Sequence, residues 1–105
     1  MSFIEGQGIL GKIRFVDGEF PAYDRTYLIV TAEPDYIEVL NVSSIRGKER
    51  KLAFPTNERL RVFRPSFVKL DSLTRVERSD WGNLQVLGSG KPLDANELAR
   101  IKGLL

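Results

Sequence analysis

Apolar and polar residues alternate in the first regular stretch of the chain. Residues 9–16 read ILGKIRFV, with apolar Ile13 and Phe15 on either side of Arg14. Such alternation predicts a strand with one buried face. The residues that follow, 17–24, read DGEFPAYD and predict a loop because they contain both glycine and proline.

The next run is largely apolar. Residues 25–33, RTYLIVTAE, are rich in β-branched and aromatic side chains and end before Pro34, which predicts a strand buried on both faces. Residues 36–42, YIEVLNV, alternate again. Because only the short, proline-containing turn 33–35 separates the two runs, we expect them to form an antiparallel hairpin.

Further strand patterns follow in the second half of the chain. LAFP, residues 52–55, offers a short apolar anchor, and LRVF, residues 60–63, predicts a strand. SFVKLDSLTRVE, residues 66–77, predicts two more short strands. Short strands separated by frequent turn signals indicate a mainly β domain, folded as a small barrel or sandwich.

The C-terminal residues 92–105, PLDANELARIKGLL, differ in kind. Asp94 can cap a helix, and Glu97 follows three residues later, as in a capping box. Leu93 and Leu98 are spaced as a hydrophobic staple. The segment therefore predicts a helix whose apolar face packs on the strands. The residues expected on that face are Leu98, Ile101, Leu104 and Leu105.

Composition limits the chemistry more than it limits the fold. The chain has 105 residues, a common size for a single domain, and contains neither cysteine nor histidine. The usual ligands of zinc, copper and haem and the usual neutral-pH proton shuttle are therefore missing. Neither glycine-rich nucleotide motif occurs, so we expect no cofactor. No secretory signal or long apolar run is evident, which leads us to expect a cytoplasmic protein with no membrane segment.

Positive charge is concentrated in residues 43–64, SSIRGKERKLAFPTNERLRVFR. Seven basic and two acidic residues give this segment a charge of +5, whereas the whole chain has +2. Exposed loops often carry Lys and Arg merely for solubility, but recognition of single-stranded RNA also combines basic and aromatic side chains. We expect residues 44–51 to form an exposed loop. The candidate RNA-binding residues are Arg46, Lys48, Arg50 and Lys51.

Arg25 is a further candidate, because it follows Asp24 at the head of the apolar strand. An arginine at a strand end can present its planar guanidinium to a phosphate from a rigid support. A surface ion pair with a nearby acid is the simpler interpretation. Ser43 and Ser44 close the strand of residues 36–42, where hydroxyls are also ordinary turn residues.

Three separated stretches together resemble the MazF/PemK (Kid) family of toxins from bacterial toxin–antitoxin systems. The opening of the family is similar to GKIRFVDGEF followed by DRTYLIV. Its segment from a strand-end Thr or Ser through a basic loop to Pro-Thr is similar to SSIRGKERKLAFPTNERL. Its closing strands and terminal helix are similar to SFVKLDSLTRVERSDW and LDANELARIKGLL. The resemblance covers nearly the whole chain.

The resemblance implies a small SH3-like barrel of the CcdB/PemK toxin type with a C-terminal helix, forming one domain over residues 1–105 and assembling as a homodimer. It also implies an endoribonuclease that cuts single-stranded RNA without a metal, through the RNA 2′-hydroxyl, and that a cognate antitoxin blocks. Arg25 corresponds to the family's phosphate-stabilising arginine, and Ser43 or Ser44 to its Thr or Ser hydroxyl. Glu19 or Asp24 could take the 2′-proton.

Two positions depart from the family pattern. Thr26 stands where the family usually has proline, and Lys12 stands where it commonly has aspartate. Two other functions stay open. One is a non-catalytic barrel that binds RNA or a protein partner, and the other is a CcdB-like poison of a topoisomerase.

Overall fold

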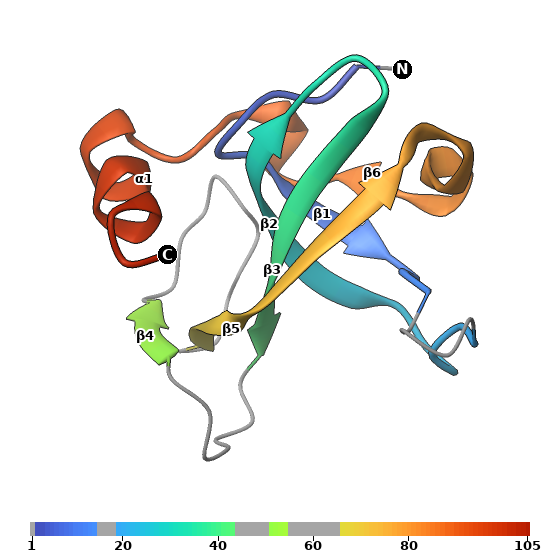
Figure 1. Ribbon diagram of the computed structural model, residues 1–105, viewed down its shortest axis with the longest axis horizontal. Helices are drawn as coiled ribbons and strands as arrows, with labels where there is room; N and C mark the ends of the chain where they lie inside the picture. Colours follow the sequence, from blue (N-terminus) through green and yellow to red (C-terminus); the bar gives the residue numbers. More distant parts are fainter. Residues whose placement is uncertain (1, 15–18, 44–50, 55–65) are drawn as a thin grey trace.

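The computed structural model describes residues 2–14, 19–43, 51–54 and 66–105 (Figure 1). Its elements lie in the following order: β1 Gly8–Gly11, β2 Arg25–Ala32, β3 Tyr36–Ser43, β4 Lys51–Phe54, β5 Ser66–Glu77, the 3₁₀ helix η2 Arg78–Asn83, β6 Gln85–Val86, the 3₁₀ turn η3 Gly88–Gly90 and α1 Ala95–Lys102.

The described strands form one twisted sheet in the order β4-β5-β3-β2-β1-β6 (Figure 1). Every neighbouring pair is antiparallel. A mainly β fold with a C-terminal helix, which the sequence predicts, is therefore confirmed. Within the described ranges β4 and β6 are the two edges and do not pair with each other. The described sheet is therefore open, and its arrangement is consistent with a small barrel-like fold.

Strands β2 and β3 form the antiparallel hairpin that the sequence predicts, and the structure places this hairpin at the centre of the sheet. Residues 27–30 of β2 are all buried, which confirms a strand covered on both faces. The pairing shifts between Ile29 and Thr31, so Val30 lies at a bulge. A bulge increases the local twist and reverses the faces to which the following side chains point.

Strand β5 corrects the prediction of two short strands in residues 66–77. It is one strand of 12 residues that pairs with β3 along both of its halves. The pairs Val39–Thr74 and Asn41–Lys69 show that β5 contains three more residues than β3 between them. Ser72 supports this bulge, since its Oγ accepts a hydrogen bond of 2.8 Å from the backbone N–H of Asn41. An odd register shift exchanges the two faces of the strand.

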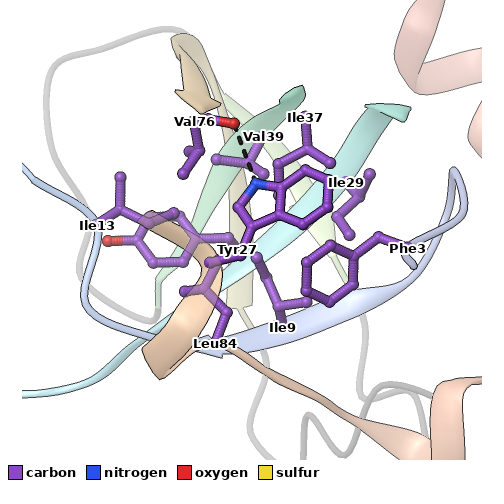
Figure 2. Close-up of a cluster of buried hydrophobic side chains, with 10 residues drawn as sticks. Phe3, Ile9, Ile13, Tyr27, Ile29, Ile37, Val39, Val76 and Leu84 are labelled. Atoms are coloured by element: carbon purple, nitrogen blue, oxygen red, sulfur yellow. Dashed lines mark hydrogen bonds between the residues drawn. The ribbon is translucent and has the colours of Figure 1, made fainter. Parts of the chain in front are cut away.

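The sheet has a hydrophobic core on each face. One core brings α1 and the segment before it against the central strands. Its residues are Leu28, Val30, Leu40, Val42, Val68, Leu70, Leu93 and Ile101. The other core holds the N-terminal segment and η2 against the opposite face (Figure 2). Its residues are Phe3, Ile9, Ile13, Tyr27, Ile29, Ile37, Val39, Val76, Trp81 and Leu84.

The C-terminal helix begins as predicted. The side chain of Asp94 accepts a 2.9 Å hydrogen bond from the backbone N–H of Asn96, and Ile101 is buried in the core. The expected apolar face is wrong at its end, because Leu104 and Leu105 follow the helix and are 42% and 48% exposed. The helix ends before these residues, so the helical periodicity no longer points them at the sheet.

Two other boundaries differ from the sequence prediction. Strand β1 covers only Gly8–Gly11, and residues 12–14 after it are not in a strand. The apolar anchor LAFP contributes to a strand of its own, β4, which pairs with residues 66–69 of β5. The strand expected over residues 60–63 lies outside the described residues.

Candidate functional site

Arg25 and Ser43 lie at the same end of the β2–β3 hairpin. Arg25 is the first residue of β2 and Ser43 is the last residue of β3. The final pair of the ladder is Thr26 with Val42, and Arg25 and Ser43 are the next residues on the two strands. The antiparallel register therefore brings together two candidate residues that the whole hairpin separates in sequence.

Arg25 contacts its surroundings through both its backbone and its side chain. Its backbone pairs with Gly11 of β1, and its guanidinium carbon lies 5.3 Å from the centre of the Tyr23 ring. Its Nε is shielded from solvent. The strand thus sets the position of the Arg25 backbone, and the Tyr23 ring lies against its guanidinium, an arrangement suited to a group that meets a phosphate.

The pKa of Tyr27 depends on its burial and on the charge of Arg25. Burial raises the pKa of Tyr27 above its usual value of 10.0, while the positive charge of Arg25 and a hydrogen bond with the backbone of Ile13 act in the opposite direction. Figure 2 shows the Tyr27 hydroxyl on the Ile13 side of the core cluster. The Arg25 charge therefore acts on a neighbouring buried group.

The two candidate bases lie on the segment that leads into β2. Glu19 and Asp24 are both exposed, and Asp24 directly precedes Arg25. Both carboxylates therefore belong to the loop beside the Arg25 end of the sheet, where a substrate could reach them.

The segment after β1 brings further positive charge to the same region. The backbone N–H of Lys12 donates a 2.9 Å hydrogen bond to Oδ1 of Asn83. Arg14 pairs with Asp80 at 3.2 Å, and its guanidinium carbon lies 4.9 Å from the centre of the Phe20 ring. Residues of η2 thus hold this segment in place.

Sequence reasoning missed the aromatic residues Phe20 and Tyr23. Each contacts an arginine at this end of the sheet. The available signal was the loop sequence FPAYD, residues 20–24, in which two aromatic residues flank Pro21 and Ala22 outside any strand pattern. Aromatic residues in a polar loop, unlike those in strands, are not expected to serve the core.

The structure describes only one of the remaining predicted site residues, Lys51. Ser44, Arg46, Lys48 and Arg50 lie outside the described residues. Lys51 does not belong to the predicted loop, because it is the first residue of β4, where its backbone pairs with Lys69 of β5. The suggestion that the basic cluster binds RNA stays a prediction.

A metal centre was not expected, and the described residues contain no group of three or more aspartates or glutamates placed to hold a metal ion. No helix in the described part of the chain has the length and apolar character needed to cross a membrane. No protein-family model matches the chain, and no curated protein matches it.

A pocket of about 650 Å³ lies at the other end of the hairpin. It is lined by the turn after β2, the N-terminal segment and η2, through Ser2, Phe3, Ala32, Glu33, Pro34, Arg78 and Trp81. Arg78 donates a 3.0 Å hydrogen bond to the carbonyl of Pro34 across it. Since Arg25 and Ala32 are the two ends of β2, this pocket is separate from the Arg25 end of the sheet.

Proposed function

We propose that the chain is a toxin-type endoribonuclease that cleaves single-stranded RNA without a metal. The observation that carries the proposal is the pairing register that sets Arg25 beside Ser43. Arg25 matches the arginine of the MazF/PemK family, which the sequence resembles, and Ser43 or its neighbour Ser44 matches the family's Thr or Ser hydroxyl. A phosphate at this strand end would meet a guanidinium and a hydroxyl supplied by adjacent, firmly paired strands.

The proposed reaction uses the nucleophile of the substrate itself. The RNA 2′-oxygen attacks the adjacent phosphorus as the bond from phosphorus to the 5′-oxygen breaks, which leaves a 2′,3′-cyclic phosphate and a 5′-hydroxyl. Negative charge grows on the nonbridging oxygens during this step. Arg25 and the serine hydroxyl would stabilise that charge, an effect often of about 3 kcal/mol for one well-placed donor.

Two protons must also move. Glu19 or Asp24 would accept the proton of the 2′-hydroxyl, and the departing 5′-oxygen gains a proton from a protonated side chain or from water. Both carboxylates are exposed in the loop that leads to Arg25, which supports this role without selecting one of them.

The partners follow from the same proposal. A homodimer would join two such sheet ends into a longer RNA groove, and an antitoxin with an acidic segment would compete with RNA for the positive charge. The basic residues Arg46, Lys48, Arg50 and Lys51 would then contact phosphates on either side of the cleaved bond. The place of action would be the cytoplasm, where messenger RNA is available.

The test is cleavage of a long unstructured RNA by the purified protein in excess EDTA. We expect fragments that end in a cyclic phosphate and begin with a 5′-hydroxyl. The control is the same sequence with 2′-O-methyl groups, which lacks the nucleophile and should stay intact. Binding of RNA with no cleavage over many sequences would instead support the non-catalytic barrel. Cleavage of the 2′-O-methyl RNA would exclude the proposed mechanism.

A further inference from the structure

Two exposed aromatic side chains, Phe20 and Tyr23, lie in the loop that leads to Arg25. Phe20 is 44% exposed and Tyr23 is 61% exposed, whereas Pro21 between them is buried. A buried proline anchors the loop to the body of the protein while its aromatic neighbours stay accessible. Both rings are therefore accessible to a ligand.

Each of these rings is in contact with an arginine. The guanidinium carbon of Arg14 lies 4.9 Å from the centre of the Phe20 ring, and that of Arg25 lies 5.3 Å from the centre of the Tyr23 ring. Each ring therefore carries a guanidinium over one face, and its exposed part offers an apolar surface next to a positive charge.

Both arginines are connected to the body of the fold. Arg14 is bound to Asp80 of η2 at 3.2 Å, and the backbone of Lys12 is bound to the Asn83 side chain of the same helix. Arg25 begins the central strand β2. The two aromatic and arginine pairs are thus supported by η2 and by the sheet rather than by the loop alone.

An unpaired stretch of RNA has the matching chemistry. Its bases are flat and apolar on both faces, and each is joined to a negatively charged phosphate. A ring with an adjacent guanidinium can stack on a base while the cation attracts the phosphate next to it. A purely hydrophobic protein surface would match the rings but would offer no phosphate or other anion to the adjacent arginines.

We propose that Phe20 and Tyr23 are stacking platforms for two unpaired bases next to the phosphate that is cleaved. This inference rests on the proposed function and adds to it the way in which the substrate is held. Stacking tolerates any base, since every base has a flat face. The two platforms would therefore favour unpaired over double-stranded RNA without requiring one sequence at those positions.

A new tryptophan at each position tests the inference directly. Phe20→Trp and Tyr23→Trp are titrated with a 2′-O-methyl oligonucleotide, which binds without being cut, and with an abasic strand of equal length and charge. We expect quenching of the new indole by the first strand and little change with the second. The native Trp81 is the internal control, because it is 5% exposed and its Nε1 donates a 3.1 Å hydrogen bond to the carbonyl of Val76. Equal quenching by both strands would overturn the inference.

The second measurement is the affinity of variants for the 2′-O-methyl strand. Phe20→Leu and Tyr23→Leu should each bind the 2′-O-methyl strand about tenfold more weakly, while Tyr23→Phe should bind like the wild type. Tyr36→Leu is the matched control. Tyr36 lies at the other end of the hairpin, and the guanidinium carbon of Arg75 is 3.7 Å from the centre of its ring. An unchanged affinity of both leucine variants would overturn the inference.

The outcomes separate the inference from the proposed function. Base-dependent quenching in a protein that never cleaves RNA would support the platforms and reject the nuclease. Normal cleavage with unchanged affinity in the leucine variants would support the nuclease and reject the platforms. If the leucine variants instead lose self-association and keep their RNA affinity, the rings form an interface between copies of the chain, and the inference is wrong.

Discussion

Arg25 and Ser43 lie side by side at one end of the central hairpin, each joined by a peptide bond to one member of the Thr26–Val42 pair. The loop of residues 19–24 and the segment after β1 border the same end. The residues proposed to act in cleavage and the rings proposed to hold the RNA bases therefore lie at the same end of the sheet. Substitutions at this end test what each residue does.

Replacing Arg25 with alanine should slow single-turnover cleavage by a factor of about a hundred to a thousand, because a donor that acts mainly on transition-state charge is lost. Binding of uncleavable RNA should fall much less. Arg75→Ala is the control, since Arg75 also contacts a tyrosine ring, 3.7 Å away, at the far end of the hairpin. Equal cleavage rates for wild type and a folded Arg25→Ala protein would remove Arg25 from the site.

The serine hydroxyls can be distinguished by a pair of variants. If Ser43 supplies the hydroxyl, Ser43→Ala should slow single-turnover cleavage about tenfold or more, and Ser44→Ala should have little effect. We expect this order because Ser43 ends β3 beside Arg25. Ser43→Thr, which keeps the hydroxyl, should retain most of the activity. The reverse ranking of the two alanine variants would assign the role to Ser44.

The basic cluster should determine how binding depends on salt. The logarithm of RNA affinity should fall with the logarithm of salt concentration by about 0.7 per phosphate neutralised on a single strand. The double variant Lys48→Ala with Arg50→Ala should flatten this slope. Lys91→Ala with Arg100→Ala is the control of equal charge, because both residues are exposed near α1. The same slope in both double variants would favour a solubility role.

Tyr27 should make the stability of the protein sensitive to high pH. Since burial raises its pKa in the folded state above the usual 10.0, the folded protein holds the phenolic proton longer than the unfolded chain does. The free energy of unfolding should therefore fall as pH rises above about 10, by at most about 1.4 kcal/mol per pH unit from this group.

Two variants isolate the Tyr27 effect. Tyr27→Phe should remove that part of the pH dependence, measured by urea unfolding at several pH values. Arg25→Ala should raise the pKa of Tyr27 further, because the charge of Arg25 lowers it. Spectroscopic titration of the tyrosines checks this shift, and an unchanged pKa of Tyr27 would mean that the Arg25 charge does not act on the phenol.

Gly11 of β1 lies close to the end of η2 and to Leu84 after it. A Cβ atom at this position would be 2.7 Å from Cδ2 of Leu84 and 2.8 Å from the carbonyl oxygen of Asn83. Gly11→Ala should therefore lower the free energy of unfolding by about 1–3 kcal/mol. Gly82→Ala is the matched control, because no atom lies within 4 Å of its added Cβ, and it should change stability by at most about 0.5 kcal/mol. Similar urea midpoints for both variants would contradict the close approach.

The sequence was sufficient to predict those elements whose formation depends on residues close together in the chain. The apolar run of β2, the turn at residues 33–35 and the capping of α1 by Asp94 are all present in the structure. Each arises from side chains and turn residues within a few positions of one another, so the local sequence contains the cause. The candidate residue Arg25 could be identified in the same way, because the strand it begins was evident from composition.

Apart from the β2–β3 hairpin, only the tertiary structure decided how the strands pair. β5 became one strand because its two halves share β3 as a partner, and its bulge depends on the distant contact of Ser72 with Asn41. The adjacency of Arg25 and Ser43 and the exposure of Phe20 and Tyr23 likewise depend on register and on packing across the sheet. No local pattern contains these relations, because a strand acquires its register, and a side chain its surroundings, only from residues far away in the sequence.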